Sequence, residues 1–428
     1  MEAGGDALED LVNRPDARPG LTCRFCGAPL SRVFVDLGVQ PLANSYLEPA
    51  DLGKAEPFFP LCVFVCGECL LVQLPEEEKP EAIFSDYAYF SSYSESWLRH
   101  AEAYARAMIE RFGFGPGHQV VEIASNDGYL LRWFAECGIP VLGVEPAANV
   151  AEAARAAGIP TVVRFFGEST ARELVAEGSR ADLLVGNNVL AHVPDLNDFV
   201  AGLKILLAPT GVLTMEFPHL LRLMAEDQFD TIYHEHYSYF SFATVQKVFA
   251  AHGLTLFDVE ELPTHGGSLR IYVRHDADAS KPVGERVGDL LAREAAAGLA
   301  RLETYGSFAE RVRGVKRGLL RFLIQAKEEG RSVAAYGAPA KGNTLLNYCG
   351  VRTDFVDYTV DRSPHKQGRY LPGTRIPIHG PDRLRETRPD YVLILPWNLK
   401  EEIMGQMADV RSWGGRFVVA IPEVQVLE

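Results

Sequence analysis

The sequence contains no apolar run that approaches the roughly 20 residues a membrane-spanning helix needs. It also has no excess of positive charge, because 57 acidic and 42 basic side chains leave the 428 residues with a formal net charge of −15. Binding to a phosphate backbone depends on a basic face, so this balance argues against nucleic acid as a partner. We therefore expect a small-molecule substrate, with neither a membrane nor a nucleic acid as partner.

A secretion signal is also missing, since residues 1–21 are acidic and rich in Gly, Pro and Ala instead of basic and then apolar. Cysteine is scarce, with seven in the chain, and four of these form two Cys-x-x-Cys pairs. In a chain without a secretion signal, such pairs favour metal binding over disulfides. We expect a cytoplasmic protein that acts as a monomer.

The two Cys-x-x-Cys pairs predict one metal site. Each pair can form a knuckle that directs two thiolates at one ion, so Cys23, Cys26, Cys66 and Cys69 supply the four ligands of a tetrahedral zinc site. Two separate redox pairs are the weaker interpretation, because paired knuckles at this separation are a specific signal. A four-thiolate site has no open position for water, so the predicted zinc is structural and stabilises a small module.

Length and pattern predict an α/β protein of three domains, because single hydrophobic cores stop growing well below this size. Strands that end in polar turns alternate with helices after the first module, which predicts a doubly wound, mostly parallel sheet. A helical stretch over 283–329 precedes a second strand–turn–helix unit at 332. We expect a zinc-binding domain over 1–90, a central Rossmann-like domain over 91–282 and a second Rossmann-like domain over 283–428.

The first strand–turn–helix unit lacks the Gly-x-Gly-x-x-Gly turn of nicotinamide enzymes. Its turn, residues 124–128, carries an aspartate, and an acidic loop would repel a pyrophosphate. S-adenosylmethionine (SAM) has a cationic sulfur and no phosphate, so it fits this turn, and a glutamate at the end of the next strand would hold its ribose. The candidate SAM-binding residues lie at strand ends: Glu122, Ala124, Asn126, Asp127, Gly128, Glu145, Pro146, Asn187 and Asn188.

The densest group of proton-transfer side chains is Thr231-Ile-Tyr-His-Glu-His-Tyr-Ser-Tyr-Phe240. Histidine titrates near neutral pH, and glutamate and tyrosine can donate to or accept from a developing enolate. The cluster therefore suits removal of a proton beside a carbonyl, and we interpret it as the catalytic segment. A polar turn with half-buried aromatic rings is the alternative for any single residue, but a whole cluster of satisfied polar groups is demanding to bury. His192, after a strand of the central domain, is expected to face the same crevice.

The second strand–turn–helix unit, Ser332-Val-Ala-Ala-Tyr-Gly-Ala-Pro-Ala-Lys-Gly-Asn343, carries a lysine where the first carries an acid. Glycine amides, a helix amino terminus and one ammonium predict a pocket for a diphosphate. The next strand end would add a carboxylate for a ribose or base and two basic side chains for phosphate. An empty, degenerate Rossmann repeat is the alternative. The candidate substrate residues of this domain are Lys341, Asn343, Asp361, His365 and Lys366.

Four segments occur in order: Glu122-Ile-Ala-Ser-Asn-Asp-Gly128, Glu145-Pro146, Asn187-Asn-Val-Leu-Ala-His192 and Tyr233-His-Glu-His-Tyr-Ser-Tyr-Phe240. With them the chain resembles, over nearly its whole length after Thr22, the sugar C-methyltransferases of branched deoxysugar and antibiotic biosynthesis. The resemblance implies a zinc-binding domain, a SAM-dependent methyltransferase core and a carboxyl-terminal Rossmann-like domain that holds the sugar nucleotide. The implied reaction is methylation at C3 of a nucleotide-linked 4-keto-6-deoxyhexose, with dTDP as the expected nucleotide.

The same resemblance implies roles for single residues. His236 would be the general base, with Tyr233, Glu235 and His192 around the sugar, while Tyr87 or Tyr89 would reach in from a phenol-rich stretch at the domain junction. A 4-keto group acidifies the C3 proton, and the enolate carbon then attacks the sulfonium methyl in line. His-Glu-His lacks the His-Glu-x-x-His spacing of zinc hydrolases, so the predicted reaction needs no catalytic metal. Base and acid are not distinguished by residue type alone, since neighbouring groups couple their titrations.

Two other classes of protein are alternative interpretations of the sequence. A nicotinamide-dependent nucleotide-sugar oxidoreductase would use the second α/β unit, but the acidic first turn disfavours it. A non-catalytic zinc scaffold with a lapsed core is disfavoured because the acid–base cluster is complete.

Overall fold

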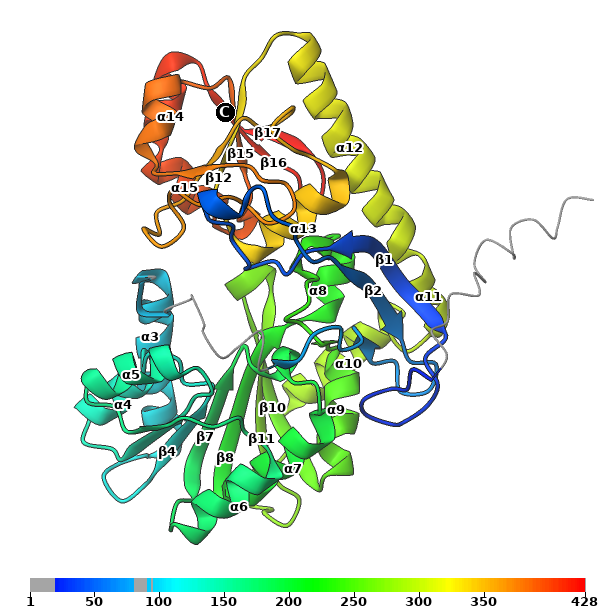
Figure 1. Cartoon of the computed structure of the whole chain (residues 1–428). Coiled ribbons are helices and arrows are strands. Elements are labelled where there is room, and N and C mark those ends of the chain that lie inside the picture. Colours follow the sequence, from blue (N-terminus) through cyan, green and yellow to red (C-terminus); the bar gives the residue numbers. More distant parts are fainter. Residues whose placement is uncertain (1–19, 81–90, 94, 428) are drawn as a thin grey trace, which may run out of the picture.

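The structure is a computed structural model that describes residues 20–80, 91–93 and 95–427 (Figure 1). The predicted Tyr87 and Tyr89 lie outside the described residues. Three β-sheets carry the architecture, and helices cover the second and third of them. No described helix is long and apolar enough to cross a membrane.

The amino-terminal module is built on an antiparallel sheet with the order β1-β2-β3-β9. Its strands are β1 (Arg32–Gln40), β2 (Phe59–Val65), β3 (Val72–Gln73) and β9 (Ser238–Tyr239). The last strand comes from the predicted catalytic segment, and it pairs Tyr239 with Val72 and Ser238 with Gln73. The module is therefore completed by residues that lie more than 160 positions further along the chain.

The central sheet has the order β10-β11-β8-β7-β4-β5-β6. Strands β4 to β8 are parallel, and β11 and β10 extend the sheet antiparallel at one edge. The predicted doubly wound sheet is confirmed. The strands are β4 (Val120–Ile123), β5 (Val141–Val144), β6 (Thr161–Val162), β7 (Ala181–Asn187), β8 (Leu207–Pro218), β10 (Leu254–Leu262) and β11 (Ser268–His275).

Helices pack on both faces of this sheet, because its strands are apolar on both sides. One face meets α3 (Glu95–Phe112), α4 (Leu131–Glu136) and α5 (Ala148–Ala156). The other meets α6 (Glu168–Ala176), α7 (Leu196–Leu206) and α9 (Phe242–Ala251). With both faces covered, the open crevice lies beyond the carboxyl ends of the strands. α8 (Leu220–Ala225) leads from β8 towards the catalytic segment.

The helical stretch predicted over 283–329 is observed as α10 (Glu285–Ala296), α11 (Leu302–Gly306) and α12 (Phe308–Glu328). α12 runs from the amino-terminal module to the carboxyl-terminal sheet (Figure 1). Phe308 at its start stacks on Phe34 of β1, with ring centroids 4.6 Å apart and an interplanar angle of 7°. The helix thus shares one apolar core with both regions.

The carboxyl-terminal sheet has the order β14-β13-β12-β15-β16-β17 and is parallel except for its last strand. Its strands are β12 (Val333–Tyr336), β13 (Thr359–Val360), β14 (Ile378–His379), β15 (Tyr391–Ile394), β16 (Arg416–Val419) and β17 (Gln425–Leu427). The flanking helices are α13 (Ala340–Cys349), α14 (Asp382–Thr387) and α15 (Lys400–Gln406).

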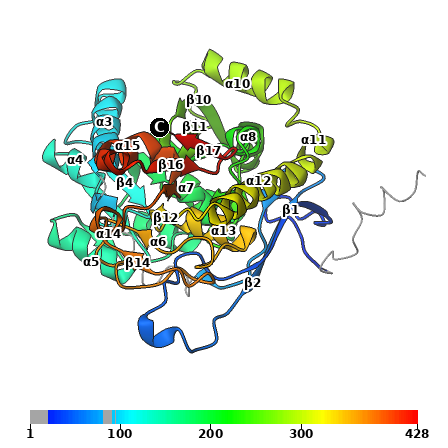
Figure 2. The same ribbon diagram turned by 90° about the horizontal axis from the view of Figure 1, so that it is seen from above.

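The segment between β1 and β2 lies against the carboxyl-terminal sheet region (Figure 2). Leu47 forms an antiparallel bridge with Tyr370, Glu56 accepts a hydrogen bond from the Gly373 amide, and Arg375 donates to the Leu52 carbonyl. The amino-terminal module therefore contacts both of the other regions.

Candidate active site

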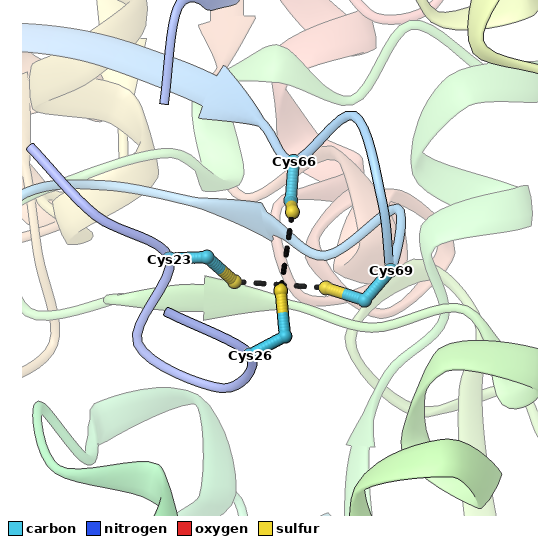
Figure 3. Close-up of side chains that lie close together, drawn as sticks. All are labelled: Cys23, Cys26, Cys66 and Cys69. Carbon is cyan, nitrogen blue, oxygen red and sulfur yellow. Dashed lines mark hydrogen bonds between the residues drawn. The ribbon is translucent and has the colours of Figure 1, made fainter. Parts of the chain in front are cut away.

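The four predicted zinc ligands converge at one corner of the amino-terminal module (Figure 3). Their Sγ atoms all lie within 4.8 Å of one another, with 3.6 Å between Cys23 and Cys69 and 3.5 Å between Cys26 and Cys66. Sulfur atoms bonded at ~2.3 Å to a tetrahedral zinc ion are about 3.8 Å apart, so this donor set fits zinc. With four protein thiolates the site has no position for substrate, and its role is structural.

The turn after β4 has a backbone conformation that few side chains adopt. Ala124, Asn126 and Gly128 have φ angles of 56°, 51° and 77°. The Glu145 carboxylate at the end of β5 stabilises the turn, because it accepts hydrogen bonds of 2.9 Å from the amides of Asn126 and Ala147. Each of its oxygens keeps a second lone pair for a further donor such as a ribose hydroxyl.

The polar groups around this turn are buried and acidic. Oδ1 of Asp127 is buried and has no hydrogen-bond partner in the described part of the chain, and the Asn187 amide is buried as well. Burial, together with the nearby carboxylates of Asp127 and Glu145, raises the pKa of Glu122 well above its usual value. Buried polar groups are normally satisfied, so these atoms fit a bound polar ligand, and their charge fits a cationic one. The residues present therefore fit SAM. Pro146 follows Glu145 directly.

A short 3-10 helix, η2 (Ser91–Tyr93), closes over the same turn. The Ser91 amide donates to Oδ1 of Asn126 at 2.9 Å, while the amide and hydroxyl of Ser92 donate to Oδ2 of Asp127 at 3.1 and 2.5 Å. Residues 91 and 92 are thus attached to the predicted SAM turn, whereas Tyr87 and Tyr89 lie outside the described residues.

His236 is buried in the catalytic segment with a defined tautomer. Its Nδ1 lies 2.8 Å from the carbonyl oxygen of Thr231, and a carbonyl only accepts, so Nδ1 carries the proton. In the neutral ring, Nε2 therefore has the lone pair of a base. The Tyr233 ring lies 4.0 Å from the His236 ring, and His192, at the end of η3 (Leu190–His192), meets it edge-on at 4.7 Å.

Burial keeps His192 and His236 neutral and raises the pKa of the neighbouring Glu235. It lowers the pKa of His236 well below the usual value, with His192 adding to the effect, and it lowers the pKa of His192 to about 4. The pKa of Glu235 is raised to about 7 by burial, which outweighs the Asn44 amide and the Lys366 ammonium. The segment thus pairs a neutral imidazole with a carboxyl group that titrates near neutrality.

The predicted diphosphate turn follows β12, and Gly337 in it has a φ of 92°. The Lys341 ammonium lies 2.8 Å from Oδ1 of Asn398 and 4.7 Å from the centre of the Trp397 ring. The Asp361 carboxylate accepts hydrogen bonds from the amides of Ala338 and Ser363, both at 2.8 Å. The turn therefore combines a held cation, a helix amino terminus and a carboxylate after the next strand.

The remaining candidate substrate residues of the carboxyl-terminal domain are Lys366, His365 and Asn343. Lys366 donates to the Ala338 carbonyl at 2.8 Å, and His365 is exposed. Asn343 is buried, and its Nδ2 donates to the Ala43 carbonyl of the amino-terminal module at 2.6 Å. Its contact in this structure is between domains, and its predicted contact with substrate stays a prediction.

Asp230, six residues before His236, joins the catalytic segment to the carboxyl-terminal domain. The indole nitrogen of Trp397 donates to its Oδ2 at 2.7 Å, and burial raises the pKa of Asp230 to about 6. On the other side, a Cβ added at Gly266 would lie 2.4 Å from the Trp397 ring, so glycine is needed for this approach.

His265, in the loop before β11, has a φ of 55°. Its Nε2 lies 3.1 Å from Nδ2 of Asn188, and its ring lies 5.3 Å from that of Trp97 on α3. Trp97 in turn stacks 6.0 Å from Tyr129, which follows the SAM turn. This series of contacts links the SAM crevice to the loop before β11.

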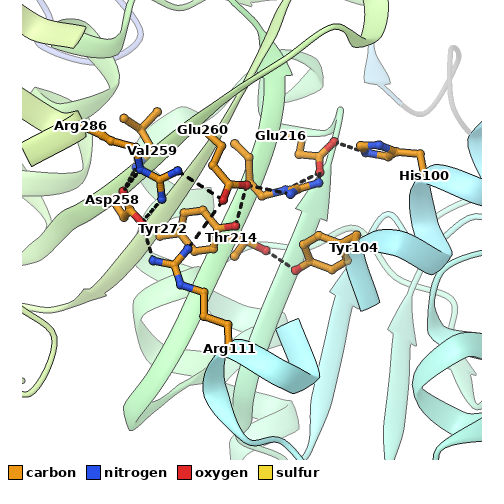
Figure 4. A network of polar contacts seen from close by, with 11 residues as sticks. His100, Tyr104, Arg111, Thr214, Glu216, Asp258, Val259, Glu260, Tyr272 and Arg286 are labelled. Carbon is orange, nitrogen blue, oxygen red and sulfur yellow. Dashed lines mark hydrogen bonds and ion pairs between the residues drawn. The ribbon is translucent and has the colours of Figure 1, made fainter. Parts of the chain in front are cut away.

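A polar network joins α3 to strands β8, β10 and β11 (Figure 4). Glu216 of β8 accepts from the guanidinium of Arg270 at 2.5 and 2.7 Å and pairs with Nε2 of His100 at 2.9 Å. These contacts hold the pKa of Glu216 below its usual value despite complete burial. The network fixes α3, and with it Trp97, against strands β8 and β11. Its further members are Tyr104, Arg111, Thr214, Asp258, Glu260, Tyr272 and Arg286.

Three contact residues were missed from the sequence: Asn44, Asp230 and Trp397. Asn44 meets Glu235 across 191 positions, and Asp230 meets Trp397 across 167. No local spacing signals such contacts, because each residue reads as an ordinary loop or turn residue in its own segment.

Comparison with known proteins agrees with this geometry. Residues 23–84 match a zinc-binding domain, residues 97–259 a methyltransferase domain, and residues 263–422 a C-methyltransferase C-terminal domain. Fold and site together define a SAM-dependent methyltransferase with a structural zinc module. The chain is 37% identical over 423 residues to C-methyltransferase NovU of Streptomyces niveus, which covers 98% of this chain and 99% of that one. The chain therefore belongs to the C-methyltransferase family.

Other similarities are partial. The chain is 24% identical over 99 residues to a ubiquinone biosynthesis O-methyltransferase of Rhodopseudomonas palustris, which is 23% of this chain and 39% of that one. Magnesium protoporphyrin IX methyltransferase of Synechocystis, solved with bound SAH, is 14% identical and has a TM-score of 0.33 over 41% of this chain and 83% of that one.

Proposed function

We propose that this SAM-dependent C-methyltransferase acts at C3 of a nucleotide-linked 4-keto-6-deoxyhexose, with dTDP as the nucleotide. The observation that carries the proposal is the state of His236. Its Nδ1 proton is held by the Thr231 carbonyl, so Nε2 is the basic atom, and burial keeps the ring neutral at pH 7. A neutral, oriented imidazole is suited to remove a proton from a carbon beside a ketone.

The groups around His236 suit the enolate that deprotonation creates. Tyr233 lies against the imidazole, and Glu235, with a pKa near 7, can be protonated at neutral pH. A phenol or a protonated carboxyl group can donate a hydrogen bond to the ketone oxygen as it gains negative charge. His192 would position the sugar from the strand-end side of the crevice.

The cofactor residues are proposed to lie within reach of this base. Asn187 ends β7, and His192, five residues later, contacts His236. When bound, SAM supplies an electrophilic methyl group. Glu145 would hold its ribose and Asp127 would face its cationic end, so that the methyl group meets the carbon that His236 deprotonates. Tyr87, before the Ser91–Tyr93 turn that caps Asp127, and Tyr89 are proposed to cover the sugar.

The carboxyl-terminal domain is proposed to hold the nucleotide. Lys341 and Lys366 supply cations for a diphosphate, Asp361 an acceptor for ribose or base, and Asn343 and His365 complete the candidate set. The domain ranges 1–90, 91–282 and 283–428 are part of this proposal. The β9 strand qualifies them, because it lies in the second range and pairs with the sheet of the first.

Exchange of the C3 proton with deuterated buffer tests the role of His236. The protein would be incubated with dTDP-4-keto-6-deoxyglucose and S-adenosylhomocysteine, so that no methyl transfer follows, and deuterium at C3 would be located by NMR. The wild-type protein should exchange C3, and His236→Asn should slow exchange by about 100-fold or more.

The matched control is His118→Asn, because His118 precedes β4 at the opposite end of the sheet. This variant should exchange at the wild-type rate. Undiminished exchange in His236→Asn would show that another residue is the base. Absence of exchange in the wild-type protein would contradict the proposed substrate.

A further inference from the structure

The loop that follows β1, residues 41–46, connects the catalytic segment to the carboxyl-terminal domain. Asn44, in this loop, donates from Nδ2 to Oε1 of Glu235 at 2.6 Å. The Glu235 side chain is only 4% exposed. Its hydrogen bond from Asn44 comes from a module 191 positions away in the sequence. A short hydrogen bond to a buried carboxylate is charge-assisted and therefore among the stronger kinds.

Residues on either side of Asn44 fix the loop to the predicted nucleotide turn. The Tyr46 hydroxyl lies 2.5 Å from the Ala338 carbonyl and 3.3 Å from Oδ1 of Asn44. On the other side, the Ala43 carbonyl accepts from Asn343 of α13. The amide that holds Glu235 is thus oriented by contacts with the turn that begins α13.

The Ala338 carbonyl is also where Lys366 is held. Its ammonium donates to that oxygen at 2.8 Å, lies 5.1 Å from the centre of the Tyr46 ring and is 4.0 Å from Oδ2 of Asp361. The same ammonium acts on Glu235 through space. Lys366 and Tyr46 are therefore shared between the nucleotide turn and the catalytic carboxyl group.

We infer that Asn44 is a positioning residue for Glu235, and that the loop 41–46 couples two events. The first is binding of a diphosphate at the predicted diphosphate turn, where Lys366 contacts the Ala338 carbonyl. The second is protonation of the Glu235 carboxyl group. The inference rests on the proposed function, because it takes the diphosphate of a sugar nucleotide as the occupant. The inference goes beyond the proposed function because it gives the amino-terminal module a direct part in the reaction.

The direction of the coupling follows from charge. Burial raises the pKa of Glu235, while the Asn44 amide and Lys366 lower it, and Tyr46 is the other titratable group that faces it. A diphosphate is a stronger acceptor for Lys366 than a neutral carbonyl, and its charge offsets that of the ammonium. Binding should therefore raise the pKa of Glu235 further, so that the carboxyl group becomes the protonated donor when substrate is present.

A double-mutant cycle tests the positioning role. In the full-length protein, Asn44→Ala should lower kcat by about tenfold or more with a smaller change in KM, and Tyr46→Phe should have an intermediate effect. In a Glu235→Gln background, Asn44→Ala should change kcat by less than about threefold. The limb of the pH–rate profile that disappears in Glu235→Gln should move to higher pH in Asn44→Ala, which a purely structural defect would not produce.

Ser45→Ala is the matched control, since Ser45 is the exposed neighbour in the same loop. It should match wild type in both rate and pH profile. Additive effects of Asn44→Ala and Glu235→Gln, or an unmoved limb, would overturn the positioning role. Thermal unfolding of Asn44→Ala and Tyr46→Phe would show whether a loss of rate reflects a loss of folded protein.

Calorimetry with dTDP as the probe tests the coupling. Titration at about pH 7 in buffers of different ionisation enthalpy gives the protons taken up on binding, and Glu235→Gln subtracts those taken up by the phosphate itself. The wild type should take up more protons than Glu235→Gln, and Asn44→Ala should reduce the difference. Equal uptake in wild type and Glu235→Gln would overturn the coupling. Absence of dTDP binding would instead overturn the proposed nucleotide substrate, and the coupling with it.

Discussion

The two strand–turn–helix units of this protein have the same local architecture and opposite charge. After β4 the turn carries Asp127 beside Glu122 and Glu145, whereas after β12 it carries Lys341, with Lys366 bonded to the Ala338 carbonyl. The first suits a cofactor that carries a positive sulfur, and the second suits a substrate that carries a diphosphate. A similar local fold can therefore carry opposite charges, and the side chains of the turn decide the sign.

The two units also differ in how their domains contact the catalytic segment. His192, which follows β7 of the central sheet, contacts His236. Trp397, whose ring lies against Lys341 of the basic turn, donates to Asp230 of the same segment. The catalytic segment therefore receives contacts from the central domain through His192 and from the carboxyl-terminal domain through Trp397. This arrangement is what an enzyme needs if it must bring a methyl donor and a sugar nucleotide to one carbon atom.

Reversing the charge of the basic turn should have the largest effect. Lys341→Glu should weaken binding of dTDP by about 100-fold or more, because a carboxylate would face the diphosphate. Its affinity for S-adenosylhomocysteine should stay within about threefold of wild type. Calorimetric titration of both ligands measures the two effects, with Lys247→Glu, exposed on α9, as the charge-matched control. Equal losses for both ligands would show that the turns do not separate them.

The pH dependence of stability should report the buried carboxyl group of the catalytic segment, Glu235. The pKa of Glu235 is raised from about 4.5 to about 7 on folding, so its contribution to stability is fully present below the lower value and is lost as pH rises through the higher one. Between about pH 5 and about pH 8, wild type should lose about 2 kcal/mol of unfolding free energy relative to Glu235→Gln. Urea unfolding at both pH values measures this, and parallel pH dependence of the two proteins would contradict it.

Neutralising the acidic turn should have a smaller and more local effect. Glu145→Gln keeps the shape of the side chain but weakens its charge-assisted bonds, so affinity for S-adenosylhomocysteine should fall by about tenfold while dTDP binding is unchanged. The control is Glu136→Gln, exposed on α4. An unchanged affinity in Glu145→Gln would mean that the ribose is held elsewhere.

The zinc ligands, the two α/β units and the helical stretch could be predicted because each has a local signal. Cys-x-x-Cys pairs, strands ending in small-residue turns, and helical periodicity are all visible within a few residues. The four thiols do converge, and the sheet of the central domain is mostly parallel.

Contacts between the domains could not be predicted in the same way. The strand Ser238–Tyr239 joins the sheet of the amino-terminal module, and Asn44 reaches Glu235, because the folded domains bring distant segments together. Two residues of strand and one loop asparagine have no periodicity to detect. The composition of the catalytic segment indicates where chemistry is concentrated, whereas the partners that set its protonation depend on the tertiary fold.

The most direct test of the account is the position of the transferred methyl group. The protein would be incubated with dTDP-4-keto-6-deoxyglucose and SAM carrying a carbon-13 methyl group, and the product would be examined by NMR. The account predicts a methyl group bonded to carbon at C3, with the C3 proton lost. A methyl ether on a hydroxyl oxygen, or a new carbon–carbon bond at another position, would contradict it.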